Sequence, residues 1–176
     1  GPRGGRAVFE GGAVRPGGAA TTTVLRDVPR LARLAGTLRW WHASAGQWRV
    51  ELLEGRGRLA GAPFRADGRM DLAAGQAPRL DLTASLGSLA ADEVLRFLPV
   101  GVMDPRLVDW LDRAIAGGTM QAASLRWSGP VDQWPDGEGP RRFDLRARVD
   151  DVAFRFQRDW PRLTALSGAL RFRDRG

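Results

Sequence analysis

Residues 79–86 read Arg-Leu-Asp-Leu-Thr-Ala-Ser-Leu, a strict alternation of polar and apolar side chains. Successive side chains of an extended strand point to opposite faces, so Leu80, Leu82, Ala84 and Leu86 would share one face of a sheet. The alternation therefore predicts a strand with one apolar face and one face in water.

The same rhythm continues on both sides of this segment. Similar alternating stretches occupy residues 37–42, 48–53, 64–72, 120–127 and 143–149. Glycine or proline interrupts them roughly every dozen residues, which is typical of an antiparallel β-meander. We therefore expect a mainly β fold built from an antiparallel sheet, with one or two short helices.

Two segments depart from the strand rhythm and favour helices. Residues 91–98 form a short helical pattern that ends before Pro99. Residues 105–116 begin with an Asp-Pro step, place apolar side chains at helical spacing and end at a Gly-Gly pair. Leu31 and Leu34 predict one further helical turn.

Local composition indicates two more strands and one irregularity. Residues 7–9 and 21–25 are rich in β-branched or apolar side chains and predict strands. The apolar series that ends at Val149 resumes one residue out of phase at Val152. This shift predicts a β-bulge or a tight turn at Asp150-Asp151.

The composition excludes several kinds of chemistry. The chain has 176 residues, of which 43 % are apolar and 27 % are charged. It has no cysteine and no tyrosine, and His42 is its single histidine. This inventory excludes a disulfide framework, most zinc sites and histidine-based catalytic triads. We therefore expect no metal site, no cofactor and no catalytic residue.

The arginine excess has three interpretations. All 27 basic residues are arginine, and the net charge is +7. Most arginines alternate with apolar residues, which favours a solvated outer strand face over a nucleic-acid surface or an acidic lipid surface.

The acidic residues do not indicate an enzyme. A hydrolase that uses two carboxylates needs them about 5–9 Å apart. Asp109 and Asp112 fall on one helix face, and Asp150-Asp151 falls at the expected turn. Each of these positions has a structural explanation, so we expect no catalysis.

The expected strands present more apolar surface than two short helices can cover. The side chains expected to face inward are Leu38, Trp40, Leu80, Leu82, Leu86, Leu145, Val149, Phe154, Phe156, Leu170 and Phe172. Such a face needs a second sheet, closure of the sheet on itself, or an apolar ligand. Composition alone favours a packed β-sandwich that serves as a scaffold or interaction module over a sheet that holds acyl chains.

The chain contains an internal repeat. Residues 27–40 and 159–172 are identical at eight of fourteen positions, at an offset of 132 residues. Both copies place a proline, two leucines and a glycine at equal spacing. The pattern predicts one structural unit and the opening of a second near residue 159, as in an internal fragment of a much longer protein.

Four motifs resemble the AsmA-like superfamily. They are Phe97-Leu98-Pro99, the stretch of residues 107–118, Leu125-Arg126-Trp127-Ser128-Gly129-Pro130 and Asp159-Trp160-Pro161-Arg162-Leu163. Within that superfamily the chain is most similar to the central domain of the very large YhdP-type proteins. The resemblance is best over residues 89–174 and weaker over 20–88. The family usually has Phe-Pro-Phe where this chain has Trp134-Pro135-Asp136, a local departure in a loop.

The resemblance implies a fold and a function. Such proteins form a long, curved, taco-shaped β-groove that spans the periplasm and is anchored in the inner membrane by a helix outside this chain. Phospholipid is thought to move along the groove toward the outer membrane. The inward-facing residues would then line the groove. Residues 1–19 would be a Gly-rich, partly flexible start, and residues 20–176 would be one internal segment. Its partners would be phospholipid acyl chains and the rest of the same chain, with no nucleic acid.

Overall fold

The computed structural model describes residues 4–14, 26–27, 30–44, 46–97, 100, 105–131, 142–155 and 161–173. Within these ranges ten strands form one sheet. The strands are β1 (Gly4–Glu10), β2 (Ala13–Val14), β3 (Leu31–Ser44), β4 (Gln47–Leu59), β5 (Ala62–Ala73), β6 (Arg79–Leu86), β7 (Leu89–Ala90), β8 (Thr119–Pro130), β9 (Arg142–Phe154) and β10 (Leu163–Arg173). The helices are α2 (Ala91–Arg96) and α3 (Pro105–Ala114).

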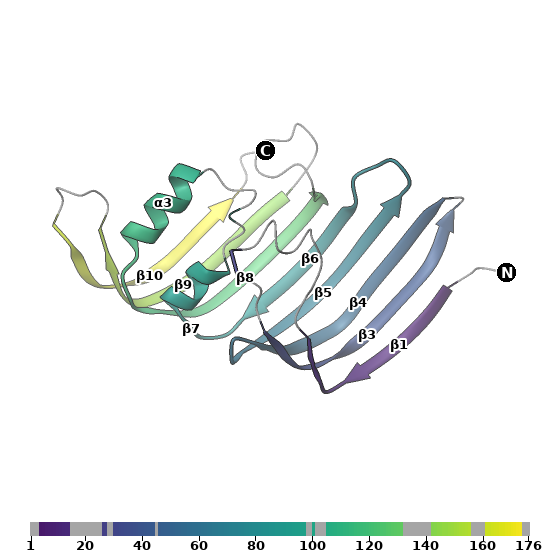
Figure 1. Cartoon of the computed structure of the whole chain (residues 1–176), viewed down its shortest axis with the longest axis horizontal. Coiled ribbons are helices and arrows are strands. Elements are labelled where there is room, and N and C mark those ends of the chain that lie inside the picture. The colour runs from purple at the N-terminus through teal and green to yellow at the C-terminus, as the bar shows by residue number, and fades with distance from the viewer. Residues whose placement is uncertain are drawn as a thin grey trace.

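The sheet is an open antiparallel layer. Its strands follow the order β1-β3-β4-β5-β6-β8-β9-β10, while β2 pairs with β3 and β7 pairs with β8. Every paired neighbour is antiparallel. Figure 1 shows β1 at one edge, β10 at the other, and the helices at the end of the sheet near β8 to β10. The expected mainly antiparallel β fold is confirmed.

The helix predictions hold with shorter bounds, and one local prediction is wrong. Helix α3 ends at Ala114, because Ile115 forms a β-bridge with Phe154 instead of extending the helix. The helical turn expected at Leu31 and Leu34 does not form. Both residues belong to β3, because the chain there pairs with β4. The strand expected at residues 21–25 lies outside the described residues.

Four strands contain a residue with left-handed backbone geometry. Arg33, Glu54, Asp151 and Ala165 have φ values of 52°, 52°, 51° and 56°. Each lies where the pairing register shifts by one residue. These are β-bulges, which bend a strand and increase its twist. The bulge predicted at Asp150-Asp151 is therefore confirmed.

The two copies of the internal repeat share structural features. Strands β3 and β10 begin at Leu31 and Leu163, which are equivalent positions of the repeat. Their bulges, at Arg33 and Ala165, are also equivalent. One residue pattern thus forms a bulged strand at two places in the same sheet.

The described residues contain a small core. The buried apolar residues among them are Ala35, Ala62, Leu89, Ala91, Ala114, Met120 and Val152, and no large side chain is fully buried. The chain exposes 11894 Å², whereas a compact monomer of this mass exposes about 8400 Å². A single open layer accounts for this difference, because one sheet alone buries neither of its faces.

The helices cover only one end of the sheet. Val94 and Phe97, at α2, pack against a cluster formed by Ala62, Leu89 and Met120. At α3, the ring of Trp110 meets Phe154 edge to face at 5.6 Å. The rest of the sheet has no second layer within the described ranges.

A short segment ties both helices together. Arg26 donates two hydrogen bonds to Asp112 of α3, at 2.7 and 2.9 Å. The neighbouring Asp27 accepts a 2.9 Å hydrogen bond from Arg96 of α2. These contacts hold α2 and α3 at the same end of the sheet.

The pairing of the last two strands predicts acid sensitivity. Asp144 of β9 accepts hydrogen bonds from Arg171 of β10 at 2.6 Å and from Arg146 at 3.2 Å. These arginines, Arg171 first, lower the pKa of Asp144 below its ordinary value of 3.8. A lowered folded-state pKa stabilises the fold above the unfolded-state pKa, and this contribution is lost as the pH falls below about 4. We expect Asp144→Asn to flatten the decline of Tm between about pH 4 and pH 2, measured by circular dichroism. Equal slopes in both proteins would contradict the role of Asp144.

Candidate functional site

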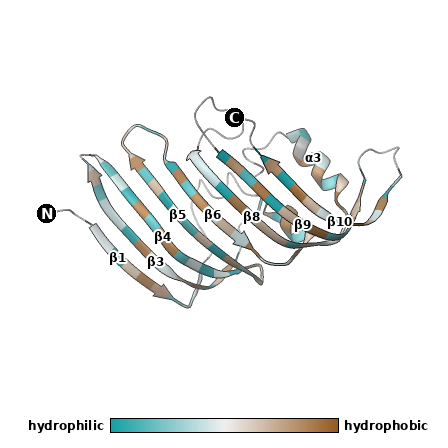
Figure 2. Ribbon diagram, turned by 180° about the vertical axis from the view of Figure 1, so that it is seen from behind, coloured by the Kyte–Doolittle hydropathy of each residue, from teal (hydrophilic) through white to brown (hydrophobic). Residues whose placement is uncertain are grey.

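The pairing register sorts the side chains of the sheet onto two faces. Residues directly opposite on neighbouring strands share a face, and Leu38 lies opposite Leu52 while Leu82 lies opposite Trp127. We call this side the apolar face. Its large side chains include Leu38, Trp40, Val50, Leu52, Phe64, Met70, Leu80, Leu82, Leu86, Leu125, Trp127, Phe143, Leu145, Val149, Leu170 and Phe172. Figure 2 shows the resulting alternation of hydrophobic and hydrophilic residues along the strands.

Nine of the eleven residues expected to face inward lie on this face. They are Leu38, Trp40, Leu80, Leu82, Leu86, Leu145, Val149, Leu170 and Phe172. Phe154 lies beyond the bulge of β9, where α3 packs against it. Phe156 lies outside the described residues. The structure thus brings the nine together, and their role stays a prediction.

The apolar side chains form rows that cross the sheet. One row runs from Leu38 through Leu52, Gly68, Leu82 and Trp127 to Phe143. A second runs from Phe64 through Leu86, Ala123 and Ala147 to Leu170. Leu52 and Phe64 also lie on the apolar face but were not among the residues expected to face inward. The alternation along their strands could have identified them, whereas the continuous rows follow only from the pairing register.

This face remains accessible to solvent. Leu170 and Phe172, on the edge strand β10, are 45 % and 54 % exposed. The side chains of Leu82, on the central strand β6, and Leu145, on β9, are half-buried. Monomeric proteins rarely expose a continuous apolar surface of this kind unless it binds something. The apolar face is therefore the candidate functional site.

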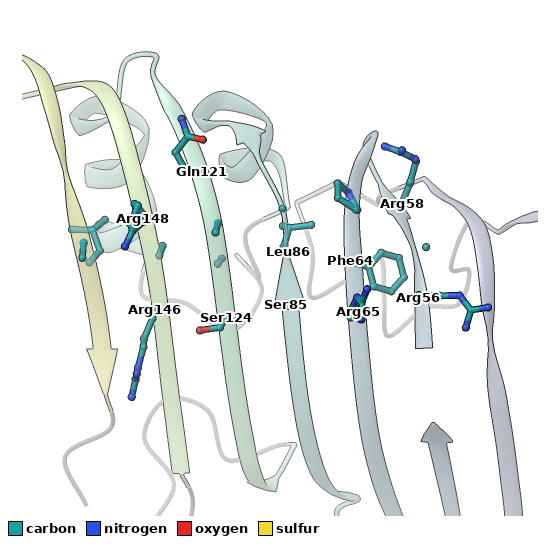
Figure 3. Close-up of a pocket in the computed structure, with 18 of the residues that line it drawn as sticks. Arg56, Arg58, Phe64, Arg65, Ser85, Leu86, Gln121, Ser124, Arg146 and Arg148 are labelled. Carbon is teal, nitrogen blue, oxygen red and sulfur yellow. The ribbon is translucent and has the colours of Figure 1, made fainter. Parts of the chain in front are cut away.

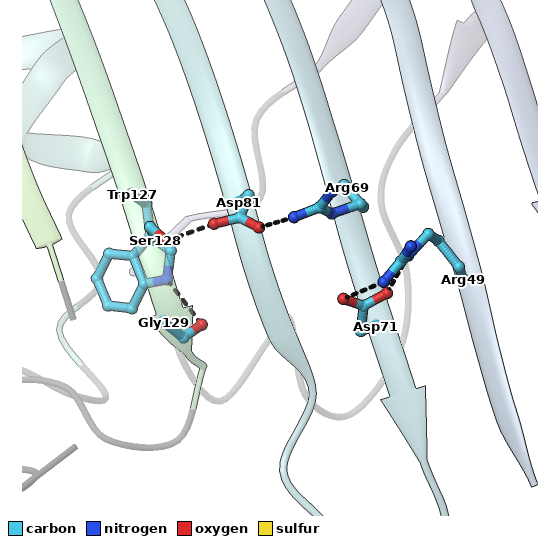
Figure 4. Close-up of polar contacts among 7 residues, drawn as sticks. All are labelled: Arg49, Arg69, Asp71, Asp81, Trp127, Ser128 and Gly129. Atoms are coloured by element: carbon cyan, nitrogen blue, oxygen red, sulfur yellow. Dashed lines mark hydrogen bonds and ion pairs between the residues drawn. The ribbon is translucent and has the colours of Figure 1, made fainter. Parts of the chain in front are cut away.

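The opposite side, which we call the polar face, carries cross-strand ion pairs. Arg49 of β4 donates to Asp71 of β5, with one contact at 3.1 Å, and Arg69 donates to Asp81 of β6 at 2.8 Å. The hydroxyl of Ser128 also donates to Asp81. Figure 4 shows these contacts linking four neighbouring strands.

These contacts lower the pKa of both acids. The hydrogen bond from Arg49 is the main cause at Asp71. At Asp81 the main cause is the hydrogen bond from Ser128, followed by the one from Arg69. Opposite charges on adjacent strands stabilise their pairing. The polar face therefore supports the sheet without needing a covering layer.

The described residues include no buried polar or charged side chain. They also contain no cluster of three or more potential metal ligands. None of the described helices is long and apolar enough to cross a membrane.

Comparison with known proteins identifies the family. The family model described as YhdP protein matches residues 20–176. The chain belongs to the YhdP family. It is 28 % identical, over 153 residues, to the intermembrane phospholipid transporter YhdP of Escherichia coli strain K12. That alignment covers 85 % of this chain and 12 % of its relative. No solved structure matches the chain.

The family match confirms the resemblance found in the sequence and extends it. It includes residues 20–88, where the sequence motifs were weaker. The shared region therefore contains nearly the whole sheet, from β3 to β10.

Because the apolar face of this YhdP-family chain is uncovered, replacing one of its side chains by alanine should change the free energy of unfolding only a little. Leu82→Ala should lower the free energy of unfolding by about 1 kcal/mol or less, because the half-buried side chain leaves no closed cavity. Met120→Ala, in the covered cluster, should cost about 2–3 kcal/mol. Urea denaturation of both variants measures the difference. A cost for Leu82→Ala as large as for Met120→Ala would show that Leu82 belongs to a packed core.

Proposed function

We propose that this chain is a lipid-conducting segment of an AsmA-like bridge-type protein. Its apolar face shelters the acyl chains of phospholipids that pass between the inner and outer membranes. The observation that carries the proposal is the set of apolar rows that continue from strand to strand without a covering layer among the described residues. We assign Leu38, Trp40, Leu80, Leu82, Leu86, Leu145, Val149, Leu170 and Phe172 to this path.

The dimensions of the sheet suit acyl chains. Six strand spacings separate β3 from β10, which gives about 29 Å along the sheet. The acyl chains of one bilayer leaflet occupy about 15 Å, half of the hydrocarbon core. Each buried CH₂ group contributes about 0.8 kcal/mol, so a continuous apolar surface removes most of the cost of crossing water. The headgroup can stay in solvent, and passive conduction needs no catalytic group.

The family and the relative support this proposal. The relative is named as an intermembrane phospholipid transporter, and this chain corresponds to 12 % of its length. We infer that the chain is one stretch of a much longer periplasmic path, tethered to the inner membrane by a helix elsewhere in the protein. The equivalent bulged strands β3 and β10 support a path built from repeats, the second of which begins near residue 159.

The alternative is a scaffold with a packed core and no lipid. It is not favoured, because the described core consists mainly of alanine, and its cluster of Ala62, Leu89 and Met120 lies against helix α2. In such a scaffold the apolar rows around Leu82 would stay exposed to water, which is unfavourable for apolar side chains.

A charge on the apolar face tests the proposal. Leu82→Asp in the full-length protein should reduce co-purified phospholipid at least about tenfold, because an unpaired charge in the acyl path costs several kcal/mol. Mass spectrometry of extracted lipid measures the change. Thr83→Asp is the matched control, since Thr83 is the next residue on β6 and lies exposed on the polar face. It should leave the lipid content unchanged.

Normal abundance and an unchanged thermal transition are required of both variants. A folded Leu82→Asp protein that carries wild-type amounts of lipid would refute the assignment of Leu82. A Leu82→Asp protein that unfolds, beside a stable Thr83→Asp protein, would favour the packed scaffold.

A further inference from the structure

One row of the polar face carries four arginines between β4 and β10. In the row of Arg39, Glu51, Arg69 and Asp81, charges of opposite sign lie opposite one another from β3 to β6. The row with four arginines, which we call the arginine row, consists of Arg56, Arg65, Ser85, Ser124, Arg146 and Arg171. Between β4 and β10 it has no acidic member, and its continuation through Ala35 ends at Glu10 on β1.

The two ends of the arginine row differ in how their charge is balanced. On β9 and β10, Asp144 bridges Arg146 and Arg171. On β4 and β5, Arg56 lies directly opposite Arg65, and neither forms an ion pair with a described residue. Like charges directly opposite across a strand pair destabilise the sheet. The Arg56–Arg65 pair is therefore a local conflict that the fold does not resolve with its own described residues.

The same arginines border a hollow in the surface. Its volume is about 1230 Å³, and seven of its described lining residues are arginine while none is acidic. Figure 3 shows Arg65 on β5 and Arg146 and Arg148 on β9, with Ser85 and Ser124 on the strands between them. Three strand spacings separate β5 from β9, or about 14 Å. The small serines leave space between the longer arginines.

We propose that the Arg56–Arg65 pair and the adjacent Ser85 form a binding site for a phosphate group. An oxyanion between the two guanidinium groups replaces their repulsion by two charge-assisted hydrogen bonds, and each planar fork can bind phosphate in a bidentate manner. The hydroxyl of Ser85, opposite Arg65 on β6, supplies a further donor. The group belongs either to a free phosphate compound or to the headgroup of an anionic phospholipid. The proposed ligands lie on the polar face and are not part of the proposed lipid path, although Leu86 and Leu170 of that path also line the hollow.

Thermal unfolding of the full chain, with and without inorganic phosphate at constant ionic strength, tests the site. Phosphate should raise the Tm of the wild type, because a ligand that binds only the folded state stabilises it. Arg65→Gln should weaken phosphate binding about tenfold, the effect of one charged hydrogen bond, and should therefore reduce this rise markedly. Without phosphate the same variant should be at least as stable as the wild type, because the substitution removes the repulsion with Arg56.

Arg69→Gln is the matched control. It lies on the same strand and face as Arg65 and removes the same charge, but Arg69 pairs with Asp81 and does not border the hollow. This variant should lose some stability without phosphate and keep the full response to phosphate. Arg56→Gln gives a second test of the site that does not depend on the folding of Arg65→Gln.

Vesicles distinguish the two sources of the phosphate group. Binding to phosphatidylglycerol vesicles but not to phosphatidylcholine vesicles, lost in Arg65→Gln and retained in Arg69→Gln, would assign the site to an anionic lipid headgroup. A response to inorganic phosphate without vesicle binding would assign it to a free phosphate compound. An equal phosphate response in wild type and Arg65→Gln, or no response of the wild type to either probe, would overturn the proposal. Leu82→Asp should leave the phosphate response unchanged, which separates this site from the lipid path.

Discussion

The structure depends on keeping a two-residue alternation in register across the whole sheet. A slip of one residue between two strands would move one apolar series to the polar face. Within the pairs β3–β4 and β9–β10 the bulges satisfy this constraint because they compensate one another. Arg33 adds a residue to β3 and Glu54 adds one to β4, while Asp151 and Ala165 do the same for β9 and β10. The strands bend, yet their apolar residues return to the same face on both sides of each bend.

The sequence alone predicts those features that depend on local pattern. Alternation identifies the strands around Leu82, and the Asp-Pro start with apolar residues at helical spacing identifies α3. The phase change after Val149 identifies one bulge. The prediction of a helical turn at Leu31 and Leu34 was wrong. Leucines three residues apart share a face of a helix, but they can also share a face of a strand when a bulge, here at Arg33, adds one residue between them. From the spacing of the leucines alone, a helical turn and a bulged strand cannot be distinguished unless the partner strand is known.

Other features depend on contacts between strands far apart in the sequence. No local pattern states that Leu82 lies opposite Trp127, or that Arg56 lies opposite Arg65. The apolar residues of one face can be guessed strand by strand, but their union into rows follows from the register. The distribution of charge among the polar rows is equally non-local. For this reason the sequence indicated a solvated arginine face and missed the row in which four arginines lie between β4 and β10 without an acidic residue.

The difference between the two faces explains how a sheet with only a small core is stable. Backbone pairing and the ion pairs around Asp71 and Asp81 hold the strands from the polar side. The apolar side chains therefore do not have to pack into a closed core, and they form a continuous surface instead. Any occupant that covers this surface stabilises the folded state by its binding free energy. In other proteins, burial of such side chains in a packed core stabilises the fold. Here the same apolar surface is still uncovered after folding, so a ligand that covers it gains the burial free energy. The proposed passive conduction of lipid requires this condition.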